Sequence, residues 1–367
     1  MPTDLHVVFP GDGDRAQSWS GIPGGLLRGL RELGVDATHL SAEPPRAVRL
    51  PLTLALSVAR RSSRRAVTEG SAEVAALRSV ALRARLLWTR GHGPIVQVGT
   101  GYAVPPGRPV VTLEDMTIRQ AIALGIPEWR AQPERSVRAR VRLQQASYGR
   151  ALACCVASDW AAGSVVSDYG VPSEKVHIVG LGRNHDPRPV PREWTTPRFL
   201  FVGQDWNRKG GPELLRAFAQ IRERAPEATL DVVGAHPPLD ADGVRGHGRL
   251  ALNVPEARDR IQGLFERATC CVMPSRFEPF GIVHVEAAAA GVPSIGTTVG
   301  GAGYAIGPEG GRLVPPGDAE ALLGAMLELS NPDTAKRMGA AALERSGRFT
   351  WRAVAERVLA ALHVPSG

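Results

Sequence analysis

The stretch PSRFEPFGIVHVEAAAAG, residues 274–291, decides the fold of the second half of the chain. The apolar residues 270–273 precede it and predict a short buried strand. The chain breaks at Pro274, and a helix is expected from Gly281 until Gly291 ends it. The stretch therefore predicts a strand–loop–helix unit of an α/β sheet.

Two carboxylates, Glu278 and Glu286, stand eight positions apart, one in the predicted loop and one in the helix. Pro279 pushes the backbone of Glu278 towards an extended conformation. The helix start that follows presents N–H groups and a partial positive charge, which suit a phosphate or a sugar oxygen, and it comprises Phe280, Gly281 and Ile282. We expect Glu286 to accept hydrogen bonds from a ribose diol. The alternative is an ordinary strand–loop–helix unit with two solvated glutamates.

The segment SRFEPFGIVHVEAAAAGVP resembles the Glu-x7-Glu signature of the retaining glycosyltransferases of family four (group 1), which have the GT-B fold. The resemblance extends through FVGQDWNRKGGPELLRAF (201–218) and GGRLVPPGDAEAL (310–322) to RFTWRAVAERVL (348–359). It implies two Rossmann-like, doubly wound α/β domains facing a central cleft, with the C-terminal helix crossing back to the first. It also implies a nucleotide-diphosphate sugar as donor, retention at the anomeric carbon, and a contact between Glu278 and the donor sugar.

A basic loop follows the first predicted strand of the second domain. This strand ends at Gly203, and Arg208 and Lys209 then precede a helix start, where they add two cations to an anion site. In the family, a Lys at the position of Lys209 contacts the donor diphosphate. An Arg commonly follows the strand glycine, but Gln204 stands there, so we expect Arg208 to supply the second charge. Catalysis would rest on stabilising the leaving diphosphate. As an exposed loop cation, Lys209 is expected to add little to stability.

Other glycines and one arginine are expected near the donor. Gly21 lies ahead of the first helix, where relatives often carry Gly-Gly close to the pyrophosphate, and here Ser20 replaces the first glycine. The segment GHGRL, residues 246–250, resembles the strand that faces the nucleotide base and contains Arg249. Gly300 predicts another close approach of the backbone to the donor.

The predicted strand 110–113 ends in Glu114 and Asp115, at the sheet edge where α/β proteins bind ligands. Relatives often carry a His-Asp pair there, near the acceptor, and Glu114 replaces the His. Together with Ser20, the two acids are assigned to the acceptor. Adjacent carboxylates favour an amine-bearing small molecule of specialised metabolism, such as an aminocyclitol or amino sugar. The alternative is that Glu114 pairs with an arginine and meets no substrate.

Residues 46–66, RAVRLPLTLALSVARRSSRRA, mix apolar and basic side chains around Pro51. One interpretation is an interfacial helix that makes weak contact with anionic lipid, which would favour a lipid-linked or polysaccharide acceptor at a membrane surface. The other is a surface helix of the first domain.

Composition is that of a globular enzyme. The 367 residues suffice for two domains, and 43% hydrophobic with 22% charged residues is ordinary. There is no apolar run of about 18 residues and no signal-peptide pattern, which predicts a cytoplasmic protein. The net charge of +8 comes almost entirely from Arg, since the only lysines are Lys175, Lys209 and Lys336. This skew resembles the codon bias of a GC-rich genome, so no nucleic-acid partner is expected. Oligomeric state stays open.

No metal or cofactor is expected besides the nucleotide-sugar substrate. The cysteine pairs 154–155 and 270–271 lie in apolar segments without the spacing of a metal site or disulfide framework, which predicts buried small hydrophobes. Asp240 and Asp242 formally match a metal-binding Asp-x-Asp. Their Pro- and Gly-rich loop lacks supporting context, so we discount it.

The predicted domains are an acceptor domain (1–186), a Pro-rich linker (187–198), a nucleotide-sugar domain (199–348) and a C-terminal helix that packs back on the first domain (349–367). Two other functions share these features. One is a nucleotide-sugar epimerase on the same fold, and the other is a non-catalytic subunit that binds a sugar nucleotide. The intact set of Arg208, Lys209, Glu278 and Glu286 argues against the non-catalytic subunit.

Overall fold

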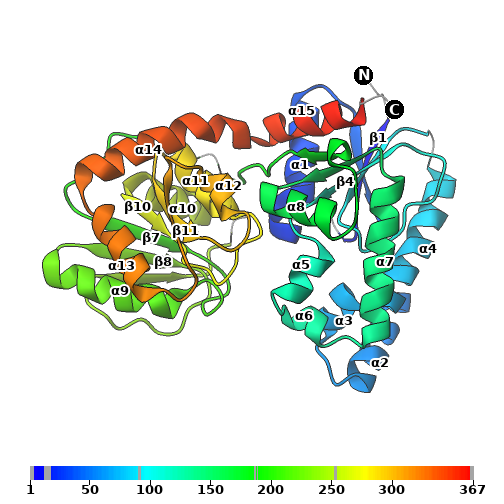
Figure 1. Ribbon diagram of the computed structural model, residues 1–367, viewed down its shortest axis with the longest axis horizontal. Helices are drawn as coiled ribbons and strands as arrows, with labels where there is room; N and C mark the ends of the chain where they lie inside the picture. Colours follow the sequence, from blue (N-terminus) through cyan, green and yellow to red (C-terminus); the bar gives the residue numbers. More distant parts are fainter. Residues whose placement is uncertain are drawn as a thin grey trace. The chain divides into compact units, whose positions relative to one another are not determined.

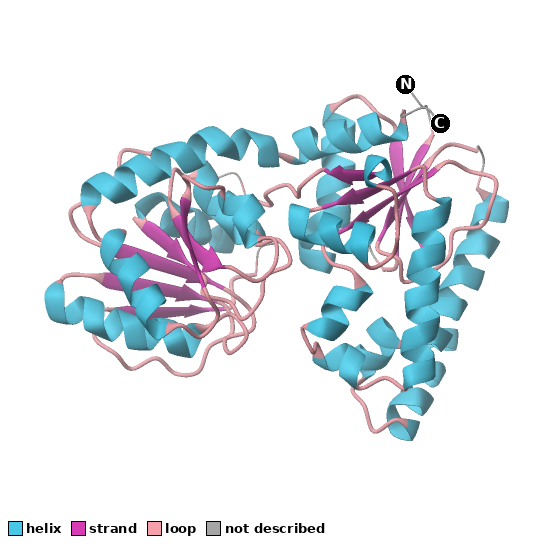
Figure 2. Cartoon of the chain, viewed as in Figure 1, coloured by secondary structure: helices cyan, strands magenta, loops and turns pink. Residues whose placement is uncertain are grey.

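The computed structural model describes residues 4–11, 18–89, 92–185, 187, 189–251 and 254–363, which form two compact units (Figures 1 and 2). Unit 1 comprises Met1–Gly180 and Trp351–Gly367, and unit 2 comprises Leu181–Thr350. Each unit contains a six-stranded sheet whose paired strands are all parallel. The predicted architecture of two Rossmann-like α/β domains is therefore confirmed. The change of unit falls at 180/181, so the predicted linker, residues 187–198, belongs to unit 2.

The sheet of unit 1 has the order β2-β1-β3-β4-β5-β6. Its strands are β1 (Leu5–Phe9), β2 (Ala37–Ser41), β3 (Ile95–Val98), β4 (Val110–Glu114), β5 (Ala153–Val156) and β6 (Val176–Ile178). Its helices are α1 (Ile22–Glu32), α2 (Arg46–Ala59), α3 (Arg64–Gly70), α4 (Ala72–Trp88), α5 (Ile118–Ala123), α6 (Pro127–Arg130), α7 (Glu134–Arg150), α8 (Asp159–Ser167) and α15 (Trp351–Leu362), with 3-10 turns η1 (Ser18–Gly21) and η2 (Ser173–Lys175).

Helix α15 packs on α1, and α4 packs against α7 (Figure 1). Gly25 and Gly29 lie one turn apart on the same face of α1. A Cβ on Gly25 would overlap the indole of Trp351, and one on Gly29 would overlap the Trp351 carbonyl. These two glycines thus form the seat in which Trp351, buried at the start of α15, is held.

The sheet of unit 2 has the order β12-β11-β10-β7-β8-β9. Its strands are β7 (Arg198–Val202), β8 (Thr229–Val233), β9 (Val244–Gly248), β10 (Cys270–Val272), β11 (Ser294–Thr297) and β12 (Gly311–Val314). Its helices are α9 (Gly211–Arg224), α10 (Pro255–Arg267), α11 (Ile282–Ala289), α12 (Ala302–Ile306), α13 (Ala319–Glu328) and α14 (Pro332–Ser346), with the 3-10 turn η3 (Gly347–Phe349). Strand order reverses between β7 and β10, and doubly wound sheets bind ligands at the carboxyl ends of the strands at such a point.

Residues 187–198 are tied to unit 2 by the guanidinium of Arg192. It donates four hydrogen bonds to carbonyls at the ends of α10 and α11: Phe265 (3.1 Å), Glu266 (3.0 Å), Ala290 (3.0 Å) and Gly291 (3.1 Å). The last carbonyls of a helix lack partners within the helix, so one half-buried side chain here satisfies two helix ends. The Pro-rich composition of the segment gave no sign of this anchoring.

Candidate functional site

Three loops of unit 2 meet at the point where strand order reverses. They follow β7, β10 and β11 and lead into α9, α11 and α12, respectively. The middle loop is hydrogen-bonded on both sides: Arg276 N donates to Arg208 O at 2.8 Å, and Glu278 N donates to Val299 O at 2.9 Å. Gly301 N returns a bond to Glu278 O at 2.8 Å. The backbone of Glu278 is thereby fixed in the extended form predicted from Pro279.

Two glycines allow the loops to come this close. Both Gly210, which caps α9, and Gly300 have positive φ, of 77° and 111°. A Cβ on Gly210 would overlap the carbonyl of Pro274, and one on Gly300 would overlap the carbonyl of Glu278. The close approach at Gly300 is therefore to the loop that carries Glu278.

Lys209 and Glu278 form a buried ion pair between the first two loops. The Lys209 side chain is only 12% exposed, so its description as an exposed loop cation was wrong. Burial lowers the pKa of Lys209, while Glu278 opposes that shift. Burial tends to raise the pKa of Glu278, but the Lys209 ammonium outweighs it and holds the pKa below its ordinary value. Ser275 Oγ also donates to Glu278, at 3.3 Å.

Arg208 lies beside this pair. Its Nη1 donates to the carbonyl of Phe277 at 3.1 Å, and its guanidinium stacks on the Phe277 ring at 4.9 Å from the centroid. Asp205 lies 3.6 Å from Arg208 Nε. The two cations predicted for the diphosphate therefore come together with Glu278, and their role towards a ligand stays a prediction.

The predicted helix start is observed: α11 begins at Ile282, and Gly281 precedes it with a φ of 85°. Phe280 is buried and turns its ring into the interior against Tyr304 and Phe349, so its side chain is not available to a ligand. Gly203 directly follows β7, and its α-carbon faces the Lys209 side chain. Arg249 is exposed and directly follows β9.

Glu286 is 5% exposed on α11. Its Oε1 accepts hydrogen bonds from the backbone N–H groups of Asn184 (3.2 Å) and His185 (3.3 Å). Burial raises the pKa of Glu286 to about 7, although both hydrogen bonds act in the opposite direction. The structure thus places Glu286 against the first residues of unit 2, a contact that its spacing from Glu278 could not predict.

His284, also on α11, was missed by the sequence analysis. It is 1% exposed, and neither ring nitrogen has a hydrogen-bond partner among the described residues. The signal was present in the otherwise apolar run IVHVEAAAA, where His284 is the one polar residue besides Glu286. Burial lowers its pKa to about 4, so the ring is neutral at physiological pH.

In unit 1, Glu114 ends β4 and is 5% exposed. Its carboxylate accepts from Thr100 N (2.9 Å), Thr100 Oγ1 (2.6 Å), Gln144 Nε2 (2.9 Å) and the Tyr148 hydroxyl. Burial raises its pKa to about 7, against the effect of the bonds from Thr100 and Tyr148. These donors occupy both oxygens, which argues against the predicted contact with an acceptor amine. The expected alternative, pairing with an arginine, is not the arrangement found either.

Asp115 is half-buried beside Glu114, and Ser20 and Gly21 precede α1. Trp19, Ser20 and Gly21 all have positive φ, of 47°, 55° and 79°. Two successive residues other than glycine in this region store backbone strain, which is common at functional sites. The acceptor assignment of Ser20 and Asp115 and the donor assignment of Gly21 stay predictions.

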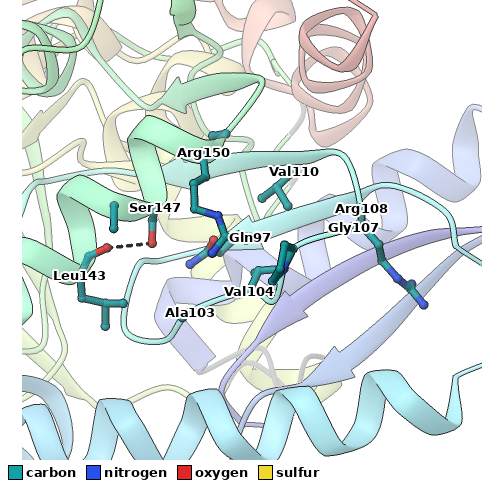
Figure 3. Close-up of a pocket in the computed structure, with 12 residues that line it drawn as sticks. Gln97, Ala103, Val104, Gly107, Arg108, Val110, Leu143, Ser147 and Arg150 are labelled. Carbon is teal, nitrogen blue, oxygen red and sulfur yellow. Dashed lines mark hydrogen bonds between the residues drawn. The ribbon is translucent and has the colours of Figure 1, made fainter.

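A cavity of about 260 Å³ lies elsewhere in unit 1 (Figure 3). Its lining includes Gln97, Val110, Ser147 and Arg150. Val110 begins β4, whereas Glu114 ends it, so the cavity lies at the opposite end of the strand from the predicted acceptor residues.

The described residues contain no cluster of three or more His, Cys, Asp or Glu side chains suited to a metal ion. Within the same ranges, no helix combines the length and apolarity needed to cross a bilayer.

Comparisons with known proteins show what part of the chain is similar to. Residues 196–331 match the family model for glycosyl transferases group 1. The chain is 32% identical over 176 residues to D-inositol 3-phosphate glycosyltransferase of Corynebacterium diphtheriae, covering 44% of this chain and 41% of that protein. It is 34% identical over 177 residues to glycogen synthase of Mycobacterium tuberculosis, covering 46% and 42%. The matches thus span less than half of these relatives.

The fold is similar to that of sucrose-phosphate synthase from Thermosynechococcus elongatus, with a TM-score of 0.68 and 20% identity over 98% of both chains.

Proposed function

We propose that this chain, whose residues 196–331 match the group 1 glycosyltransferases, transfers a sugar from a nucleotide-diphosphate sugar to an acceptor hydroxyl, with retention at the anomeric carbon. Unit 2 would hold the donor. The nucleoside diphosphate would lie at the carboxyl ends of β7 and β10, where doubly wound sheets bind ligands.

The observation that carries the proposal is the buried pair of Lys209 and Glu278, with Arg208 alongside. A diphosphate would draw the Lys209 ammonium away from Glu278 and share it with the Arg208 guanidinium. The freed Glu278 carboxylate would then accept hydrogen bonds from hydroxyls of the donor sugar. The two cations would stabilise the charge that develops on the leaving diphosphate.

The test is turnover of a panel of nucleotide sugars by Lys209→Met, Glu278→Gln and the double variant. Lys209→Met removes the cation from a buried carboxylate and should lose about 3–5 kcal/mol of stability. The double variant should recover that stability, while kcat stays about 10²–10³-fold below the parent because the cation is gone. Lys336→Met, on the exposed face of α14, is the matched control and should change neither quantity.

Parental turnover by the folded double variant would sink the proposal. An isomerised nucleotide sugar without release of free nucleotide would instead identify the epimerase. Donor binding without turnover at any acceptor would identify the non-catalytic subunit.

A specific observation favours a lipid-linked acceptor as a second candidate. Helix α2 fully buries only Thr53. Its exposed side chains after Arg46 are all apolar, and they include Val48 (51% exposed), Leu54 (44%) and Val58 (79%). Exposed arginines, Arg46, Arg61, Arg64 and Arg65, lie at its two ends and at the start of α3. An apolar face with flanking cations suits an anionic membrane surface. The amine-bearing acceptor has less support, because Glu114 is occupied inside unit 1.

Vesicles of phosphatidylglycerol and of phosphatidylcholine test this second candidate by sedimentation at low salt. We expect the protein to sediment with the anionic vesicles only, and Leu54→Glu/Val58→Glu to remain in solution. Val80→Glu, equally exposed but on α4, is the control and should still sediment. A parent protein that stays in solution with both vesicle types would contradict the membrane-surface acceptor.

A further inference from the structure

The imidazole of His284 occupies a space made for it between two glycines. Its Cδ2 lies 2.6 Å from the point where a Cβ on Gly281 would stand, and its Nε2 lies 3.2 Å from the corresponding point on Gly296. Gly296 is an interior residue of β11, and Gly281 precedes α11. A methyl group at Gly281 would displace the ring, and one at Gly296 would crowd it.

Glu278 lies across the same glycine. Its Cγ is 3.0 Å, and His284 Nε2 is 3.4 Å, from the point that a Cβ on Gly281 would occupy. The ring and the carboxylate are therefore neighbours, yet no hydrogen bond joins them while Lys209 holds Glu278. The charged groups that act on His284 are these two, Glu278 and Lys209.

A buried imidazole with both nitrogens unpartnered weakens the fold, because each polar atom loses its hydrogen bonds to water without replacement. A leucine would fill the space without that loss. A polar ring kept at this position therefore indicates a second state of the site in which one of its nitrogens is satisfied.

We propose that His284 is the alternate partner of Glu278: when a diphosphate takes the Lys209 ammonium, the imidazole N–H donates to the Glu278 carboxylate and holds it in place for the donor sugar. The exchange of Lys209 for His284 at Glu278 rests on the proposed function, because it needs a bound diphosphate. The contact between His284 and Glu278 rests on the geometry of unit 2 alone. The exchange keeps the buried carboxylate hydrogen-bonded at every stage. Without it, the buried charge would be left unpaired, which costs a large amount of free energy.

The contact can be tested without catalysis or ligand. In Lys209→Met, Glu278 has lost its cation, so His284 should already be bonded to it. We expect a protected, downfield ring N–H signal in the histidine NMR spectrum of Lys209→Met that is absent from the parent. It should be assigned by its loss in Lys209→Met/His284→Gln, and it should also disappear in Lys209→Met/Glu278→Leu. A folded Lys209→Met protein without that signal would overturn the proposal.

Inorganic pyrophosphate tests the exchange in the unaltered protein, which also covers the case in which Lys209→Met fails to fold. The same signal should grow with the bound fraction measured by calorimetry. Pyrophosphate that binds without producing the signal would overturn the proposal. Failure of pyrophosphate to bind would count against the donor site of the proposed function and against the exchange, and the Lys209→Met spectrum would still decide the contact itself.

Turnover separates positioning from packing. His284→Leu should lower kcat about tenfold or more with little change in KM for the nucleotide sugar, while its melting temperature stays the same or rises. His284→Gln keeps an N–H donor and should retain most of kcat. His177→Leu removes another ring whose Nε2 is buried without a partner, on β6 of unit 1, and should leave kcat unchanged. Equal kcat for the Leu variant and the parent would rule the role out, as would equal losses for Leu and Gln.

Discussion

Glu278 and Glu286 belong to one motif, yet their carboxyl groups have opposite electrostatic surroundings. The Lys209 ammonium holds the pKa of Glu278 below its ordinary value, despite burial. Burial raises the pKa of Glu286 to about 7, because two backbone N–H groups and the charge of Arg183 oppose it only in part. Two carboxyl groups whose pKa values are pushed apart commonly have different roles. Glu278 therefore stays charged at physiological pH, while Glu286 titrates there.

This difference predicts a pH dependence of nucleotide binding. As pH falls from 8 to 5.5, Glu286 takes up a proton at about pH 7 and loses one acceptor for the ribose hydroxyls. Affinity for a nucleoside diphosphate should therefore fall severalfold more in the parent than in Glu286→Gln, which has no carboxylate to protonate. Calorimetry across that pH range gives the dissociation constants of the parent and of Glu286→Gln. Their ratio is independent of the titration of the phosphate, because that titration affects both proteins alike. A ratio that does not change with pH would contradict the ribose assignment.

Single residues also set the limit of what the sequence could predict. Arg208, Lys209 and Glu278 could be placed together because each sits next to a helix start in a recognisable pattern. The burial of Lys209 could not be foreseen, because its partner Glu278 is remote in sequence. The same holds for Glu114, whose partners are Thr100, after β3, and Gln144 and Tyr148, on α7.

At the scale of elements, the site depends on loops that behave like short extra strands. Glu278 and Gly300 form an isolated parallel bridge beyond the ends of β10 and β11. The sequence indicated the strand–loop–helix units through apolar runs, glycines and prolines. It did not indicate that the loops pair with one another, because backbone hydrogen bonds between loops leave no periodic pattern in the side chains.

Gly300→Ala should destabilise unit 2 by about 2–3 kcal/mol, because it adds a steric overlap with the Glu278 carbonyl to the strain of a positive φ. Gly317→Ala is the matched control. Its φ is also positive, at 78°, but its Cβ would meet nothing within 4 Å, so it should cost only about 1 kcal/mol. Urea unfolding gives both values. Equal losses in the two variants would show that the loops can separate without cost.

The predicted linker contains an anchor to the elements of unit 2. Its prolines and polar residues predicted a tether between domains, but Arg192 bonds the ends of α10 and α11, and its guanidinium stacks on Trp194 at 5.0 Å. Segments of this composition are flexible only when nothing anchors them. A single arginine, which has five N–H donors, is enough to anchor such a segment.

At the scale of the whole molecule, unit 2 is an insertion within unit 1, since α15 returns to the unit that contains α1. A chain ending after Thr350 should therefore lose stability in unit 1, because the glycine seat on α1 would be left without Trp351. Unit 2, with its own core around Phe199, Phe218 and Phe265, should keep its stability. Hydrogen–deuterium exchange resolved by peptide would report each unit separately.

A chain ending after His363 is the control for that truncation and should exchange like the parent. Unchanged protection of α1 and β4 in the shorter chain would mean that α15 adds nothing to unit 1.

The insertion also sets an order of events on the ribosome. Unit 1 begins to emerge first, but α15 is synthesised only after the whole of unit 2, an interval on the order of 10–30 s at about 5–20 residues per second. Throughout that time the face of α1 around Gly25 and Gly29 has no α15 to cover it. Unit 2, translated without interruption, can fold first although it comes second. Unit 1 therefore stays incomplete for longer during synthesis, and the proposed donor site in unit 2 would be complete before unit 1 is.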